Sequence, residues 1–107
     1  MAYEERLTDL ELEKIMSEGM IYMCACPAQV AQSTRTVREL YRYQMACLGN
    51  PENDGRVHQA IARSAIAAHA ELQACMELIL VLENWDRATL SMPENLRVKQ
   101  LKAITDD

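Results

Sequence analysis

Residues 56 to 83 form the longest stretch of this 107-residue chain that keeps one helical periodicity without a break. Apolar side chains recur there at steps of three or four residues, which places them on one face of an α-helix. No Pro or Gly interrupts the stretch after Gly55. We therefore predict a long central helix over about residues 56–84, around which the other segments pack. Its apolar face consists of Val57, Ile61, Ala68, Leu72, Cys75, Ile79 and Leu82, with Ser64 filling the one gap.

The composition supports an all-α fold. Half of the residues are hydrophobic, but there is no Phe and only one Trp, so the core must consist of aliphatic side chains, Met and Ala. Gly and Pro number three each and fall mostly between the periodic segments, which is typical of helical proteins. A chain of this length forms one domain and buries roughly 65% of its surface. We predict a single all-α domain, a small antiparallel helical bundle of three to four helices.

Start and stop signals divide the chain into these helices. Thr8-Asp-Leu-Glu11 and Ser91-Met-Pro-Glu94 are capping boxes, in which a hydroxyl and a carboxylate satisfy free backbone N–H groups at a helix start. Pro27 disfavours helical geometry at the residue before it, and Gly49 to Gly55 form a loop rich in turn residues. The predicted helices span about residues 9–25, 28–48, 54–84 and 92–104, after a lead-in of residues 1–7 whose Tyr3 and Leu7 could fold back on the bundle. The alternative is one long kinked helix over residues 9–48.

Charge and hydropathy argue against several classes of partner. The net charge of −5 disfavours a nucleic-acid partner, because phosphate backbones are bound by clustered Lys and Arg. Residues 1–18 hold six carboxylates and lack the basic and apolar regions of a secretory signal. The continuous apolar runs are far shorter than the ~20 residues that span a membrane. We expect a cytoplasmic protein with no nucleic-acid or membrane partner, whose four cysteines are reduced thiols.

Three of the four cysteines are expected at one end of the bundle. If the second and third predicted helices fold back on each other, Cys75 lies near Cys24 and Cys26. Thiolates suit Cu(I) or Zn(II), and a Cys-X-Cys pair at a turn can exchange thiols. However, Cys is among the most buried residue types, and the chain has no CxxC motif. We therefore interpret these sulfurs as core residues with no cofactor, and keep a soft-metal (Cu or Zn) or thiol-redox site at Cys24, Cys26 and Cys75 as the alternative.

The sequence carries no catalytic signature. It has no glycine-rich phosphate loop and no spacing typical of a Ser-His-Asp or Cys-His arrangement. His58 and His69 are three helical turns apart, a distance of ~16 Å, so they cannot share one metal ion. Neither follows a Glu at the spacing of a di-iron helix pair. An enzyme that uses His69, Glu71 and Glu77 is the hypothesis we favour least, and we predict no catalytic residue.

Two features predict a protein partner. Arg35, Arg38 and Arg42 form a basic stripe that could bind an acidic partner or the acidic first helix of a second copy, although such stripes are often solvated faces with weak ion pairs. The long helix is also apolar well beyond the ~100° arc of a surface helix, because Ile66 lies opposite Val57. The residues that widen this arc are Ala62, Ala65, Ala70, Ala74, Met76 and Leu80.

A helix that is apolar nearly all round must be buried nearly all round. Small bundles often complete such a core by pairing as a symmetric dimer, so we expect a homodimer. The alternative is a monomer in which the other helices cover the long one. We predict a small cytoplasmic helical-bundle protein that acts by protein–protein contact as an adaptor, regulator or accessory protein. The candidate partner-binding residues are Arg35, Arg38, Arg42 and Ile66.

Overall fold

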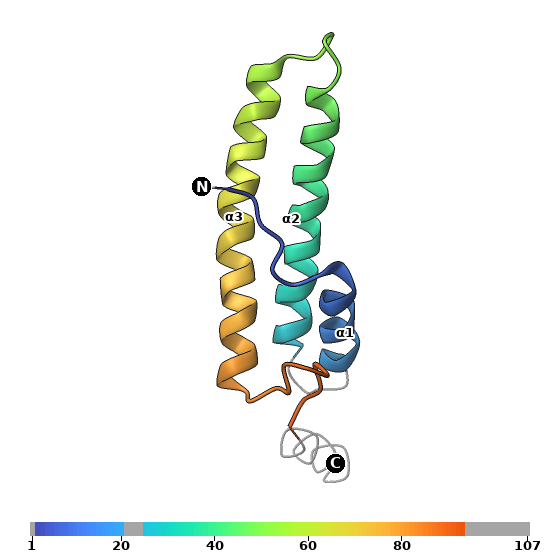
Figure 1. Ribbon diagram of the computed structural model, residues 1–107, viewed down its shortest axis with the longest axis vertical. Helices are drawn as coiled ribbons and strands as arrows, with labels where there is room; N and C mark the ends of the chain where they lie inside the picture. Colours follow the sequence, from blue (N-terminus) through green and yellow to red (C-terminus); the bar gives the residue numbers. More distant parts are fainter. Residues whose placement is uncertain (1, 21–24, 94–107) are drawn as a thin grey trace.

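The structure is a computed structural model that describes residues 2–20 and 25–93. This part of the chain holds three helices, α1 (Asp9–Gly19), α2 (Cys26–Leu48) and α3 (Gly55–Leu82), and no strand. Figure 1 shows α2 and α3 side by side in opposite directions, with α1 next to the beginning of α2. The prediction of an all-helical chain with one long helix near residues 56–84 is confirmed. From residue 94 onward, the predicted helix at 92–104 lies outside the described residues.

Helix α2, and not α3, is the helix with two helical neighbours. It packs against α1 on one side and α3 on the other, whereas α1 makes no close backbone approach to α3. Gly19, the last residue of α1, lies against Ala28 in α2; a Cβ at Gly19 would be 3.1 Å from the Ala28 Cβ. Since α1 and α2 lie beside each other, the alternative of one kinked helix over residues 9–48 is wrong.

The helix starts agree with the local sequence signals. Thr8 Oγ1 accepts a hydrogen bond from Glu11 N at 3.0 Å, and Thr8 N donates to Glu11 Oε1 at 2.9 Å, so the predicted capping box is present. Pro27 occupies the first turn of α2, where its missing N–H costs least. Asp54 caps α3 by accepting from Arg56 N at 3.0 Å.

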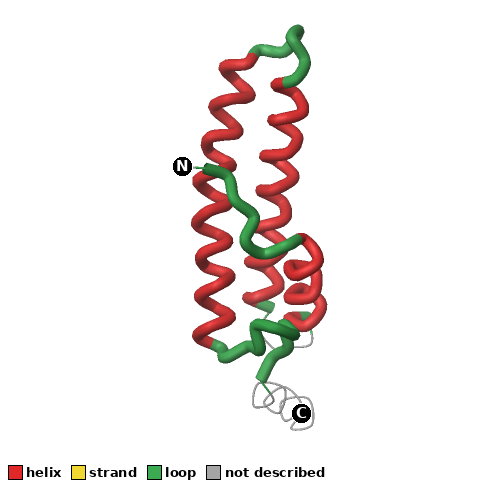
Figure 2. Tube along the Cα trace, in the orientation of Figure 1, coloured by secondary structure: helices red, strands yellow, loops and turns green. Residues whose placement is uncertain are grey.

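The apolar core lies at the end of the molecule where α1 packs. Its buried members come from all three helices, from the segment before α1 and from the segment after α3, which turns back beneath the bundle (Figure 2). Met92 N in that segment donates to the buried Glu18 Oε1 at 3.1 Å. The core residues are Leu7, Leu12, Ile15, Ala31, Met76, Leu80, Trp85, Leu90 and Met92.

Residues 2–8 run in an extended path across α2 and α3, and we call them the N-terminal arm (Figures 1 and 2). Leu7 is completely buried and Tyr3 is half-buried, so both side chains do fold back on the helices. The described part of the lead-in is therefore packed on the helices through the two residues that could fold back on the bundle.

The face that α3 buries differs from the predicted one. The buried residues are Ala62, Ala65, His69, Gln73, Met76 and Leu80. The predicted face is only partly covered: Val57 is 52% and Leu82 70% exposed, while Ile61, Leu72 and Ile79 are half-buried and Ile79 packs against the edge of the core. We call this predicted set the open stripe (Val57, Ile61, Ser64, Ala68, Leu72, Cys75, Ile79 and Leu82). The physical reason is that α2 presents a buried arginine, which needs the polar side chains of His69 and Gln73 opposite it.

Helix α3 is, within the described ranges, the one helix that is long and apolar enough to cross a membrane. Core helices of soluble proteins share this length and composition. The helix nevertheless carries Arg63, Glu71 and Glu77, which would be costly in a bilayer.

Candidate functional site

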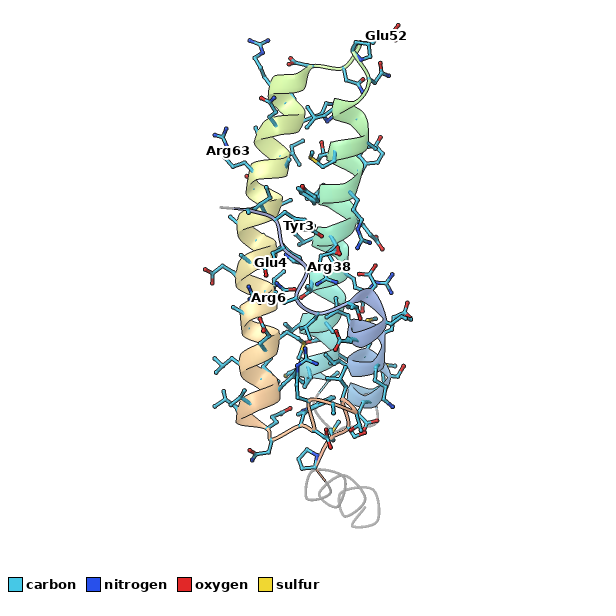
Figure 3. All side chains as sticks on the ribbon, viewed as in Figure 1. Tyr3, Glu4, Arg6, Arg38, Glu52 and Arg63 are labelled. Carbon is cyan, nitrogen blue, oxygen red and sulfur yellow. The ribbon has the colours of Figure 1, made fainter. Side chains whose placement is uncertain are left out.

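Arg38, in the middle of α2, has a completely buried side chain. Its Nε donates to His69 Nε2 at 2.8 Å, its Nη2 to Gln73 Oε1 at 3.0 Å and its Nη1 to Asp9 Oδ1 at 3.0 Å. Every nitrogen of the guanidinium thus has an acceptor, as burial of a charged group requires. We call Arg38, His69 and Gln73 the polar core. Figure 3 shows Arg38 where the arm residues Tyr3, Glu4 and Arg6 cross the helices.

Gln73 holds the backbone of the arm. Its Oε1 accepts from Arg6 N at 2.8 Å and from Leu7 N at 3.2 Å, and its Nε2 donates to Glu4 O at 3.0 Å. One buried side-chain amide therefore pairs with three backbone groups of the extended segment. These contacts do not depend on which side chains the arm carries.

The side chains of the arm alternate between the helices and the solvent, as they do along an extended strand. Tyr3 stacks on Tyr41 of α2, with ring centroids 3.8 Å apart, and also contacts His69. Glu5 accepts from Tyr3 Oη at 2.7 Å and forms an ion pair with Arg42. Leu7 enters the apolar core.

The outward side of the arm is tied to α3 by one ion pair. Arg6 donates through Nε and Nη2 to Glu77 Oε1, at 2.9 and 2.6 Å. Both partners are partly exposed, so this pair contributes about 1 kcal/mol or less. The arm thus depends mainly on its inward contacts.

The predicted basic stripe finds its acidic partner within the same chain. Arg42 donates to Asp9 Oδ2 at 2.9 Å and also pairs with Glu5, while Arg35 pairs with Glu13 at 2.6 Å. Arg38 is completely buried while the N-terminal arm is in place. Of the predicted partner-binding arginines, Arg35 and Arg42 remain partly exposed.

Ile66, the fourth predicted partner-binding residue, lies under the arm. It is half-buried and lines a cavity of about 280 Å³ together with Ala2, Arg6 and His69. Its apolar surface is therefore partly covered by the same chain.

The electrostatics of the polar core favour a neutral histidine. Burial, reinforced by the adjacent Arg38 guanidinium, lowers the pKa of His69 below its ordinary value of 6.5. To accept from Arg38, His69 must carry its proton on Nδ1. Burial and the hydrogen bond to Glu5 raise the pKa of Tyr3, which keeps the phenol protonated. The hydrogen bond from Arg42, together with that from Arg38, lowers the pKa of Asp9 below 3.8.

The three residues of the least-favoured enzyme hypothesis are not brought together. His69 Nε2 is already occupied by Arg38, Glu77 is paired with Arg6, and Glu71 is exposed on another side of α3. The polar core holds structure in place and leaves no basic nitrogen of His69 directed at an open cavity.

None of the described cysteines, Cys26, Cys47 and Cys75, is fully buried in the apolar core. Cys75 is an exposed free thiol on the open stripe, and Cys47 is a half-buried free thiol. Cys26 is exposed and disulfide-bonded, so the expectation of four reduced thiols is wrong for this residue. Cys24 lies outside the described residues. Among the described residues, no group of three or more His, Cys, Asp or Glu side chains is placed to hold a metal ion.

A second surface of interest is the apolar groove between α2 and α3, on the side where the open stripe lies. It has a volume of about 380 Å³ and contains Val37 and Leu40 of α2, the latter 43% exposed. On α3, Ala68 in the groove and Gln73 at the arm lie about 140° apart around the helix axis. The α3 residues that line the groove are Ala60, Ile61, Ser64, Ala65 and Ala68.

Sequence reasoning missed the polar core because it weighed α3 by its apolar residues. The available signal was that His69 and Gln73, four residues apart, share a face with Ala62, Met76 and Leu80.

Comparison of the chain with protein-family models, with curated proteins and with solved structures finds no match.

Proposed function

We propose that this chain is a small cytoplasmic protein that acts by protein–protein contact, as an adaptor, regulator or accessory protein, and that it pairs with a second copy through the open stripe. The observation that carries the proposal is that the open stripe is exposed at intervals from Val57 to Leu82 and half-buried at Ile61, Leu72 and Ile79. Two α2–α3 hairpins placed stripe to stripe would complete an antiparallel bundle of four long helices. In that assembly α3 would become the central helix.

The spacing and size of the stripe residues support this pairing. They recur at steps of three and four, the seam pattern by which helices interlock. Small residues, Ser64 and Ala68, occupy its middle and permit close approach of a facing helix. Larger side chains, Val57 and Leu82, are more than half exposed near its ends. Because Val57 and Leu82 are already partly buried, covering the rest of each side chain would contribute about 1–2 kcal/mol.

A single charge in the groove is expected to separate the copies. The Ala68→Glu variant puts a carboxylate at an exposed position of the stripe, so we expect light scattering to give the 12.2 kDa mass of one chain, where the unaltered protein gives twice that mass. The matched control is Ala67→Glu, the same exchange at an exposed position 100° around the helix, and it should remain paired. A one-chain mass for the unaltered protein at high concentration, or equal behaviour of the two variants, contradicts the pairing.

Cys75 provides a second test without altering the fold. Its free thiol is exposed in the single chain but would be covered when two stripes meet. We expect its alkylation by iodoacetamide, followed by mass spectrometry, to slow at least severalfold as the protein concentration rises. In the Ala68→Glu variant the rate should stay fast at every concentration. A rate that is independent of concentration in the unaltered protein would contradict the proposal.

The alternative function, a soft-metal or thiol-redox protein, has narrower support. The disulfide bond of Cys26 favours its redox form, whereas Cys75 faces outward on the open stripe. The cytoplasmic location belongs to the main proposal and is supported by the charged residues spread over α3. Recovery of the native protein in carbonate-washed membranes would contradict that location.

A further inference from the structure

The N-terminal arm contacts the helices as a bound peptide contacts a receptor. The side-chain amide of Gln73 forms three hydrogen bonds with the backbone of the arm between Glu4 and Leu7. Alternate side chains, those of Tyr3, Glu5 and Leu7, enter separate environments on the helices. Backbone hydrogen bonds combined with pockets for alternate side chains are the usual mode of recognition of extended segments.

The charged residues of the site for the arm are held by bonds within the helices. Arg38 is fixed by His69, Gln73 and Asp9, at 2.8, 3.0 and 3.0 Å. Asp9, the first residue of α1, also accepts from Arg42 at 2.9 Å. None of these bonds involves a residue of the arm. If the arm leaves, the arginines therefore stay in position, and Gln73 presents an unpaired amide N–H and a carbonyl oxygen with a free lone pair.

The charge of this site specifies the chemistry of what it binds. Arg38 and Arg42 supply two positive charges, and the helices supply one nearby carboxylate, Asp9, against them. A second carboxylate must come from the bound segment, and Glu5 provides it. Tyr3, two residues before this acid in the arm, stacks on the aromatic ring of Tyr41 in α2. Leu7, two residues after the acid, fills an apolar position.

We infer that the surface of α2 and α3 under the arm is a binding site for an extended segment of another protein, and that the arm occupies it as a tethered stand-in. The segment that fits carries an aromatic residue, an acidic residue two positions later and an aliphatic residue two positions after that. This inference is independent of the pairing through the open stripe, because the two surfaces lie on different sides of α3.

The tether explains how such a site is kept closed. A segment attached by a short connection has an effective concentration in the millimolar range at its own site. A free segment of equal intrinsic affinity therefore competes poorly, and its apparent affinity falls in proportion to the fraction of open sites. Weakening the inward contacts of the arm must then strengthen the binding of a free segment.

The test uses the full chain and a fluorescent peptide with the sequence of residues 2–8. The receptor variant Tyr3→Ala/Glu5→Gln weakens the arm and leaves Leu7, Arg38, Arg42 and Gln73 unaltered. By fluorescence anisotropy, we expect this variant to bind the peptide at least about tenfold more tightly than the unaltered protein does. A control peptide with the same two exchanges should bind the variant at least about tenfold more weakly than the native peptide.

Two results would overturn the inference. One is the absence of saturable binding to the variant at up to about 1 mM peptide, while its circular dichroism stays helical. The other is equal binding of the native and control peptides. Should the double variant lose its helical signal, Tyr3→Ala alone serves the same comparison, and failure to bind the peptide there would also overturn the inference. Light scattering on the same samples reports the pairing through the open stripe separately.

Discussion

Replacing Arg38 by methionine should lower the free energy of unfolding by about 3–5 kcal/mol, measured by urea denaturation followed by circular dichroism. Methionine fills much of the space but donates no hydrogen bond. His69 Nε2 then loses its donor inside the protein, and both Asp9 and Gln73 lose a charged partner. A domain of this size has a total stability of about 5–15 kcal/mol, so the variant should lose a large part of it.

The matched control lies one turn earlier on the same helix. Arg35→Met removes an arginine whose side chain is partly exposed and whose contact with Glu13 is a surface ion pair. Such a pair contributes about 0–1 kcal/mol, so this variant should unfold close to the unaltered protein. Equal losses for the two variants would show that burial and hydrogen bonding of Arg38 do not stabilise the fold in the way described.

Acid should destabilise the protein in two stages, the first beginning near pH 6.5. Burial and Arg38 lower the pKa of His69 in the folded chain, with smaller opposing and reinforcing effects of Glu5 and of Arg6 and Arg42. Below about pH 6.5, His69 is protonated in the unfolded chain but stays neutral in the folded chain. The free energy of unfolding therefore falls with pH until the pKa of folded His69 is passed. His69→Gln should remove this stage. His58→Gln, which leaves the contact between Arg38 and His69 intact, should retain it.

The second stage should begin below about pH 4.5. The pKa of Glu5 lies below 4.5 because hydrogen bonds from Tyr3 and Arg42 outweigh the opposing effect of burial, and the pKa of Asp9 lies below 3.8 because of Arg42 and Arg38. The unfolded carboxylates protonate first as the pH falls, so their stabilisation is lost through the folded pKa values. These groups are partly exposed, so 1 M salt should weaken the second stage more than the first. Midpoints of urea unfolding across pH 3–8 measure both stages, and a midpoint that is constant from pH 7 to pH 5 would contradict the first.

The starts of α1 and α3 could be predicted because their signals are local, whereas α1 ends at Gly19 and not near residue 25 as predicted. Thr8 and Glu11 satisfy each other's backbone groups within one turn, and Asp54 caps α3 two residues from its partner. The long helix could be predicted from its unbroken periodicity, which needs no knowledge of its neighbours. In each case the interacting residues are close in sequence.

The orientation of α3 and the role of the arm could not be predicted in this way. Both depend on Arg38, which meets its partners His69 and Gln73 from 31 and 35 residues away. Periodicity counts apolar side chains along one helix, and the open stripe has larger ones than the face that is buried. Two polar residues on one helix face are interpreted as solvent-exposed unless a buried charge is known to lie opposite them. The arm is too short for a periodic signal. The alternation of Tyr3, Glu5 and Leu7 can be interpreted only when the positions of α2 and α3 are known.

The order of synthesis gives the arm an unusual history. Its residues are synthesised before α2 and α3, yet the amide that binds its backbone belongs to Gln73, 66 to 69 positions further along the chain. Until translation has passed Gln73, the newly made arm has no complete site to bind. During that interval Tyr3 and Leu7 of the nascent chain are open to chaperones.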